Sequence, residues 1–227
     1  MALSSLPSSV AIQCQGVLFD MDGVLISSID SVERSWTTWA QNRGLDPAHA
    51  LRIVHGCRAE DTMRKLGLTL DLQAELKILE DLEVADQEGV RALDGVLPLL
   101  AALPSTSWTV VTSATRRLAR ARLAAAGITP PERMISGDDV AEGKPNPAPY
   151  LAGAALLGLD ATQCVVLEDS LSGAASGRAA GCTVIGTTFT HPAEELGAAH
   201  YLLHDVTGMQ VERTASGLLL RFTPLDR

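Results

Sequence analysis

The chain has 227 residues, of which 46% are hydrophobic and 20% charged, as expected for one soluble domain or for a core with a smaller insert. Its formal net charge of −9 argues against nucleic acid or an anionic membrane surface as the main partner. No apolar run approaches the roughly 18 residues that a membrane helix needs, and no signal peptide is evident, so we expect a cytoplasmic protein.

The first predicted strand, 16–19, lies in the segment GVLFDMDGVL and follows what reads as a short leader. Its apolar residues run up to Asp20, and Asp22 and Gly23 follow at once. In an open α/β sheet, ligands bind beyond the carboxyl ends of the strands. Two acids two residues apart at such a position therefore predict a functional site.

Residues 28–93 contain no good strand and predict a helical insert, because a loop of that length without structure is uncommon. Trp36 and Trp39 lie three residues apart, and we interpret them as the core of this insert. The acidic residues in 80–88 are typical of a solvated helix face. The predicted helices of the insert are 30–42, 59–66 and 72–92.

After the insert, strand-like and helix-like stretches alternate, which implies right-handed βαβ units. The fold class is therefore α/β, with a Rossmann-like doubly wound parallel sheet core, formed by 1–27 and 94–227, and an inserted α-helical cap domain at 28–93. The tail, 209–222, predicts an edge hairpin. The further predicted strands are 108–111, 133–135, 164–167, 182–186 and 200–203, and the predicted helices are 116–126, 147–157 and 172–180.

Polar side chains follow several of these strands. The segments are Thr112-Ser113-Ala114, Gly143-Lys144-Pro145 and Glu168-Asp169-Ser170. Together with the first strand, they should bring four carboxylates, two hydroxyls and one lysine to one rim of the sheet. Carboxylates this close repel one another and need a cation, and oxygen ligands suit Mg²⁺. We therefore predict a Mg²⁺ site formed by Asp20, Asp22, Glu168 and Asp169.

A phosphate group at this rim would be held by Mg²⁺, by Lys144, by a hydroxyl and by backbone N–H groups at Ala114. Asp20 is then placed as a nucleophile that attacks phosphorus and becomes an aspartyl phosphate. Asp22 can protonate the leaving alcohol and later take a proton from water.

The segments DMDGVL, VVTSAT, GKPNPAPYL and VVLEDSLSGAASGRAAGC resemble the motifs of the haloacid dehalogenase superfamily of phosphatases, in the subgroup with a helical cap after the first motif. The resemblance runs over most of the chain. It implies that Asp20 is the nucleophile and Asp22 the acid/base. It also implies that Asp169 is the main late Mg²⁺ ligand, helped by Asp20, the Asp22 carbonyl and Glu168. Thr112 or Ser113 could hold the phosphate, and we favour Ser113 with the Ala114 amide.

Asp22 argues against the dehalogenating members of the superfamily, which lack that second Asp. The segment HGCRAED resembles the substrate loop of β-phosphoglucomutase and of phosphatases of 2-deoxyglucose 6-phosphate and glycerol 3-phosphate, and implies that His55 and Arg58 reach the substrate. A surface loop with a helix start is an equal alternative for these two residues. The mutases carry a histidine ten residues after the second Asp, where this chain has Val32, which favours hydrolysis.

These observations predict a Mg²⁺-dependent phosphomonoester hydrolase, acting as a monomer on a small sugar or polyol phosphate. Two alternatives stay open: a β-phosphoglucomutase-like phosphosugar mutase and a non-catalytic module that binds a phosphorylated ligand. The predicted catalytic residues are Asp20, Asp22 and Lys144, and the predicted phosphate and substrate contacts are Thr112, Ser113, Ala114, Lys144, His55 and Arg58.

Overall fold

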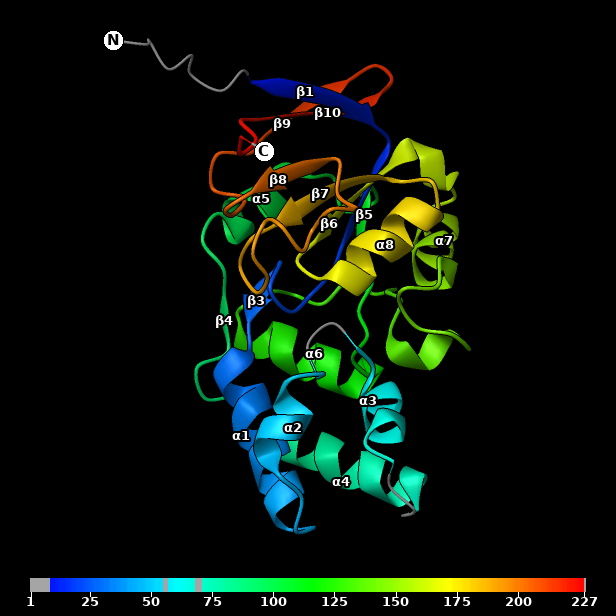
Figure 1. Ribbon diagram of the computed structural model, residues 1–227. Helices are drawn as coiled ribbons and strands as arrows, with labels where there is room; N and C mark the ends of the chain where they lie inside the picture. Colours follow the sequence, from blue (N-terminus) through cyan, green and yellow to red (C-terminus); the bar gives the residue numbers. More distant parts are fainter. Residues whose placement is uncertain (1–8, 55–56, 68–70, 227) are drawn as a thin grey trace, which may run out of the picture.

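The computed structural model describes residues 9–54, 57–67 and 71–226. Its centre is a parallel sheet with the strand order β5-β2-β6-β7-β8, which confirms the α/β class and five of the predicted strands (Figure 1). The strand predicted at 133–135 is wrong, because Ile135 makes only an isolated bridge with Val111. The strands are β2 (Gly16–Phe19), β5 (Trp108–Val110), β6 (Cys164–Glu168), β7 (Thr183–Thr187) and β8 (Tyr201–Leu203).

Helices cover both faces of this sheet, as a doubly wound fold requires (Figure 1). Side chains alternate along β2, so that Val17 and Phe19 join the core beneath α5 (Val96–Ala102) and α6 (Arg116–Ala125). Leu18 joins the opposite core, beneath α7 (Ala148–Leu156) and α8 (Leu171–Ala179). Because both faces are buried, these strands read as continuous apolar runs.

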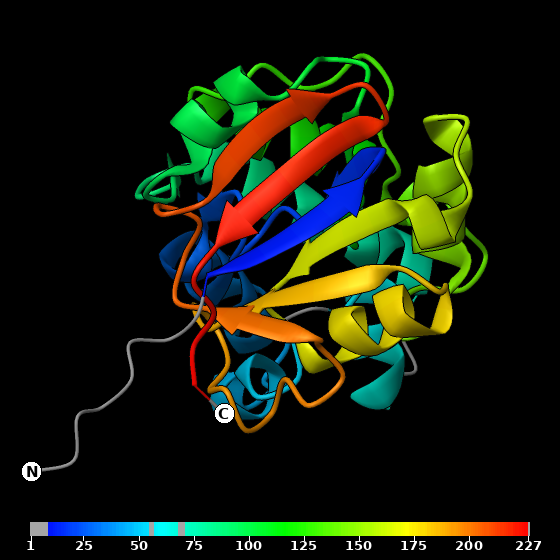
Figure 2. The same cartoon turned by 90° about the horizontal axis from the view of Figure 1, so that it is seen from above.

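A second, antiparallel sheet lies on the side of the core away from the helices between residues 29 and 85 (Figures 1 and 2). The hairpin predicted at 209–222 is confirmed as β9 (Gln210–Thr214) and β10 (Gly217–Phe222). The expectation of a mere leader before residue 16 is wrong, because all five residues of β1 (Val10–Cys14) pair with residues 218–222 of β10. Its side chains alternate between exposed and more buried positions, which is the pattern of a strand with one covered face.

Between β2 and α5, the chain forms a four-helix unit, α1–α4, with its own apolar core. Trp36 and Trp39 are buried and pack edge to face with ring centroids 5.4 Å apart, which confirms their predicted place in this core. The helices are α1 (Ile29–Gln41), α2 (Pro47–Leu51), α3 (Ala59–Lys65) and α4 (Leu72–Ala85).

The last helix of this unit ends at Ala85, although the sequence predicts helix as far as 92. Contacts with α1 end it: Arg34 Nε donates to the Asp86 carboxylate at 2.7 Å, and Ser31 Oγ donates to the Asp86 carbonyl at 2.5 Å. The chain then forms β4 (Arg91–Ala92), which pairs with β3 (Ile26–Ser27). The four-helix unit is therefore joined to the core by two adjacent, antiparallel segments, β3 and β4.

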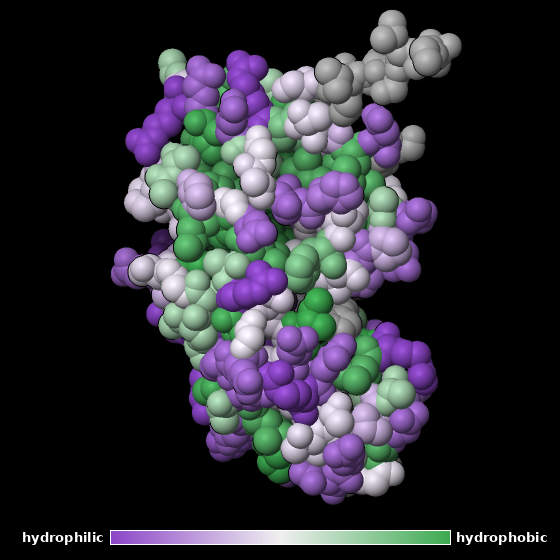
Figure 3. Space-filling model, turned by 90° about the vertical axis from the view of Figure 1, so that its left-hand side faces the viewer, coloured by the Kyte–Doolittle hydropathy of each residue, from purple (hydrophilic) through white to green (hydrophobic). Residues whose placement is uncertain are grey.

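The two parts meet at a waist that is visible in the space-filling view (Figure 3). No helix in the described part of the chain is both long and apolar enough to cross a membrane. Two short 3₁₀ helices, Gly137–Asp139 and Ala161–Gln163, complete the core.

Candidate active site

The carboxyl ends of β2, β5 and β6 bring the predicted site residues to one rim, as parallel strands require. A cavity of about 440 Å³ lies between this rim and the four-helix unit. Its core side is lined by Asp20, Asp22, Thr112, Ser113, Ala114 and Asp169, and its helical side includes Val32, Trp36, Arg58, Leu76, Lys77 and Glu80.

Lys144 is the buried cation of the rim. Its Nζ donates hydrogen bonds to Asp20 Oδ1 at 2.6 Å, to Glu168 Oε1 at 2.7 Å and to the Val111 carbonyl at 3.1 Å. Burial alone would lower the pKa of Lys144, but Asp20 and Glu168 raise it above its ordinary value. The side chain therefore carries its positive charge at neutral pH.

Glu168 is fully buried, and both of its oxygens accept hydrogen bonds. Oε1 accepts from Lys144 and from Tyr150 Oη, the latter at 2.9 Å. Oε2 accepts at 2.9 Å from the amides of Asp169 and Ser170 and from Ser170 Oγ. Burial raises the pKa of Glu168, but Lys144 and these donors outweigh burial and lower it. Glu168 is thus an ionised anchor for Lys144.

Asp20, Glu168 and Asp169 offer carboxylate oxygens that all lie within 4.8 Å of one another, which is the spacing of a metal site. Burial raises the pKa of Asp20 to about 7, against the effect of Lys144, and burial also raises that of Asp169 well above its ordinary value. When all three buried carboxylates are ionised, Lys144 alone does not balance their negative charge. Hard oxygen donors of this kind fit Mg²⁺, so the residues suit the predicted ion.

The side chain of Asp22 lies outside that cluster of carboxylates. Its Oδ1 accepts a hydrogen bond from Ser28 Oγ at 2.5 Å, and Arg122 Nη1 lies 3.2 Å from both of its oxygens. Sequence reasoning missed Arg122, because it predicted a helix at 116–126 and gave the arginines of that helix no role. The available signal is its spacing: Arg122 lies four residues after Leu118, on the buried face of α6.

The acidic side of α4 faces the core instead of solvent. Glu83 is buried and accepts a hydrogen bond at 3.0 Å from Arg122 Nη2, and Glu80 accepts one at 2.5 Å from Thr115 Oγ1. The expectation of a solvated face over 80–88 is therefore wrong at these positions. The reason is the basic and polar surface of α6, which the sequence places more than thirty residues away.

Thr112 is buried and Ser113 half-buried, and both line the cavity. The Ala114 amide, which we predicted to bind phosphate, donates to Thr112 Oγ1 at 3.1 Å. The Thr112 hydroxyl thus holds the loop, and Ser113 stays the favoured phosphate contact.

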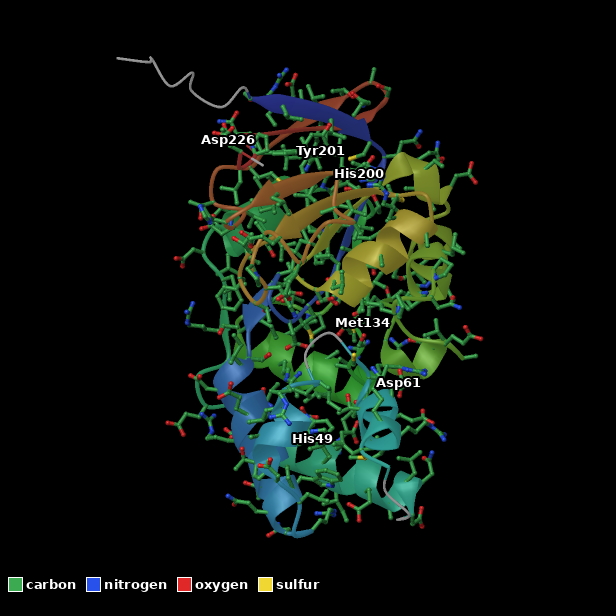
Figure 4. All side chains as sticks on the ribbon, in the orientation of Figure 1. His49, Asp61, Met134, His200, Tyr201 and Asp226 are labelled. Atoms are coloured by element: carbon green, nitrogen blue, oxygen red, sulfur yellow. The ribbon has the colours of Figure 1, made fainter. Side chains whose placement is uncertain are left out.

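Arg58 lines the cavity but is engaged with the protein itself. Nε and Nη2 donate to the Asp61 carboxylate at 2.8 and 3.1 Å, and Nη1 donates to the carbonyls of Val140 and Ala141 at 3.2 and 3.3 Å. Figure 4 shows Asp61 on α3, below the core. Arg58 therefore ties α3 to a core loop, while His55 lies outside the described residues.

Three further residues position Asp169. The Thr190 side chain hydrogen-bonds its carboxylate, and His191 Nδ1 lies 3.0 Å from its carbonyl oxygen. Gly23 has φ of +80°, and a Cβ atom there would lie 1.9 Å from Asp169 Oδ2. Glycine is thus required where the loop after β2 passes Asp169. The sequence marks Gly23 but gives no signal for Thr190.

Comparisons with known proteins show which family the chain resembles. The model of the haloacid dehalogenase-like hydrolase family matches residues 17–187. Hexitol phosphatase A of Escherichia coli (strain K12) is 39% identical over 210 residues, which cover 90% of this chain and 97% of the relative. Glycerol-1-phosphate phosphohydrolase 1 of Saccharomyces cerevisiae is 34% identical, with 83% of this chain and 80% of the relative covered.

A solved structure is also similar: a haloacid dehalogenase family hydrolase from Deinococcus radiodurans R1, with bound phosphate and sodium. It is 30% identical, covers 84% of this chain and 90% of its own, and superimposes with a TM-score of 0.61. The resemblance inferred from the four motifs is confirmed, and the chain belongs to the haloacid dehalogenase-like hydrolase family.

Proposed function

We propose that this hydrolase is a Mg²⁺-dependent phosphatase that removes the phosphate group from a small sugar or polyol phosphate. The observation that carries the proposal is Asp20, which lines the cavity with Lys144 2.6 Å away and Asp169 beside it. The names of the relatives, a hexitol phosphatase and a glycerol-1-phosphate phosphohydrolase, support the substrate class. A small phosphorylated metabolite is then its partner, and we expect it to act as a monomer in the cytoplasm.

In the proposed reaction, an oxygen of Asp20 attacks phosphorus and the bond between phosphorus and the alcohol oxygen breaks. Asp22 gives its proton to the departing alkoxide. Asp22 then takes a proton from a water molecule whose oxygen attacks the aspartyl phosphate, so that phosphate leaves and Asp20 is regenerated. Lys144 keeps Asp20 in place, and Ser113 binds a phosphate oxygen.

Asp20, Asp169 and the carbonyl of Asp22 would hold the Mg²⁺ ion, which when bound neutralises charge on the phosphoryl group. Glu168 has little capacity left for a direct bond to metal, because Lys144, Tyr150 and the segment 169–170 already occupy its oxygens. We therefore assign Glu168 to holding Lys144.

We further propose that residues 28–93 act as a cap on a core formed by 1–27 and 94–227. The separate apolar core of the four-helix unit and its two adjacent connections, β3 and β4, support this division. The cap provides Val32 and Trp36 to the wall of the cavity, and its closure would exclude water during the first step.

The charges of the cavity favour a hydrolase over a mutase, which must bind a second phosphate. Among the lining residues that the structure describes, Arg58 is paired with Asp61, Lys77 with Asp81, and Arg122 with two carboxylates. A second phosphate would have to break one of these ion pairs. The cavity therefore suits a substrate whose remainder is uncharged, such as a polyol.

Replacing the nucleophile tests the proposal. We expect phosphate release from hexitol and glycerol phosphates with Mg²⁺, and Asp20→Asn should lower kcat by about a thousandfold or more because no aspartyl phosphate forms. Glu212→Gln, an exposed change on β9, is the control. Persistent activity in Asp20→Asn would refute the assignment. Conversion of β-glucose 1-phosphate to glucose 6-phosphate would favour the mutase, and binding without turnover the binding module.

A further inference from the structure

Arg122 links the Asp22 carboxylate to the four-helix unit. We propose that Arg122, itself held by Glu83, is a positioning residue that aims the Asp22 carboxyl group for proton transfer to the leaving alcohol. This inference rests on the proposed function, because it concerns the acid/base of that reaction. It adds two residues: Arg122 on α6, to which the sequence analysis gave no role, and Glu83 on α4, which it placed on a solvated helix face.

The geometry joins three separate parts of the chain. Asp22 lies in the loop after β2, Arg122 on α6 and Glu83 on α4. Arg122 Nη1 is 3.2 Å from both Asp22 oxygens, and its Nη2 donates to Glu83 Oε1 at 3.0 Å. All three side chains line the cavity, and the Arg122 side chain is only 4% exposed.

A guanidinium group in this place restrains orientation as well as charge. The donors of a guanidinium lie in one plane, and rotation of the Asp22 carboxylate would break one of the two contacts that Nη1 makes with its oxygens. Glu83 fixes the other edge of the same plane. Within the described part of the chain, the buried Arg122 Nε has no hydrogen-bond partner, so the position of the group is set by its two carboxylates. A buried arginine with one donor left unpaired is better explained by the need to hold Asp22 than by stability.

The competing explanation is that Arg122 merely ties α6 to α4. Arg117 provides the matched comparison, because it lies on the same helix and pairs with Glu80 and Asp81 of the same partner helix, at 2.9 and 2.5 Å. Its side chain is 51% exposed and does not line the cavity. Loss of an inter-helix tie acts on stability, more in the buried Arg122 than in the exposed Arg117. Loss of Asp22 positioning should instead change the chemistry, and only in the Arg122 variants.

The experiment compares two substrates whose leaving groups differ in their need for a proton. The alkoxide of glycerol phosphate departs poorly unless it is protonated, whereas the nitrophenolate of p-nitrophenyl phosphate departs as an anion. The values of kcat/KM report the steps up to departure of the alcohol. Their ratio, glycerol phosphate over p-nitrophenyl phosphate, does not depend on the fraction of folded enzyme. The Asp22→Asn variant defines how far the ratio falls when the acid is removed.

We expect Arg122→Met to lower this ratio about tenfold or more, in the direction of Asp22→Asn. Arg122→Lys, which keeps a cation, should recover part of it, and Glu83→Gln should lower it less than Arg122→Met does. Arg117→Met should keep the wild-type ratio. If Arg122→Met does not fold, the ratios of Arg122→Lys and Glu83→Gln test the inference instead. A wild-type ratio in both of these variants would contradict it.

A ratio within about twofold of wild type in Arg122→Met, or an equal fall in Arg117→Met, would overturn the inference. The proposed function fails separately. It fails if the wild-type enzyme releases phosphate from neither substrate, and its acid/base assignment fails if Asp22→Asn leaves the ratio unchanged. If the ratio falls in Asp22→Asn but not in Arg122→Met, the proposed function stands and only the role of Arg122 is refuted.

Discussion

Lys144 holds two carboxylates, Asp20 and Glu168, that would otherwise repel each other in a buried site. The two acids differ in what else they bind. Glu168 accepts hydrogen bonds from Tyr150 and from the segment 169–170, whereas Asp20 faces the cavity. Consequently the pKa of Glu168 is lowered below its ordinary value while burial raises that of Asp20 to about 7. One acid is thereby committed to structure, and the other is left available for chemistry.

The raised pKa of Asp20 predicts that Mg²⁺ should stabilise the protein more as the pH rises. Without metal, the folded state binds this proton more tightly than the unfolded chain does, whose ordinary pKa is 3.8. That contribution is complete below 3.8 and is lost as the pH rises to about 7. Mg²⁺ competes with the proton, so the increase in Tm from chelator to Mg²⁺ should be larger at about pH 8 than at about pH 6.

Asp169→Asn is the control for this measurement, since it removes a carboxylate of the same cluster and should shrink the Mg²⁺-dependent increase in Tm at both pH values. An increase that stays constant or falls with pH would contradict the role of Asp20 as a ligand.

At the scale of elements, the first turn of α8 approaches Glu168 so closely that only glycine fits. A Cβ atom on Gly173 would lie 1.6 Å from Glu168 Oε1. Gly173→Ala would favour the helix by its propensity, but it must displace the Glu168 carboxylate from its donors. We expect it to lower the free energy of unfolding by about 1–3 kcal/mol, measured by urea denaturation.

Gly197→Ala is the matched control, because a Cβ atom there has no neighbour within 4 Å. It should change the free energy of unfolding by less than about 0.5 kcal/mol. An unchanged free energy of unfolding in Gly173→Ala would mean that Glu168 can move away from α8 without loss of stability.

The elements that sequence reasoning placed well are those whose pattern is local. The strands of the central sheet are apolar on both faces, and the site residues follow them at fixed positions. The elements it misplaced depend on distant partners. The end of α4 depends on Arg34 of α1, β1 depends on pairing with β10, and the buried state of Glu83 depends on Arg122. None of these partners can be read from the segment concerned.

At the scale of the whole molecule, the cavity and part of the stability lie on opposite sides of the core. The cavity lies between the core and the four-helix unit, whereas the antiparallel sheet β1-β10-β9 lies at the far side of the core (Figure 1). Phe222 is buried there, with its ring edge to face against Tyr201 at 5.5 Å, and Figure 4 labels Tyr201 near that sheet.

Phe222→Ala should therefore lower stability without changing the chemistry. We expect the free energy of unfolding to fall by about 3–5 kcal/mol, because a buried aromatic side chain leaves a cavity. Its kcat/KM at a temperature where the variant is folded should equal that of the wild type. A stability loss accompanied by a fall in kcat/KM would show that this sheet influences the active site.

The pairing of β1 with β10 also has a consequence for synthesis in the cell. Ser9 and Phe222, whose hydrogen bond adjoins this pair of strands, are 213 residues apart. The ribosome releases β1 long before β10 exists, so the edge of β1 lacks its partner for most of translation. An unpaired strand edge invites association with other chains. We therefore expect nascent copies on one messenger RNA to associate through β1 until β10 has been translated.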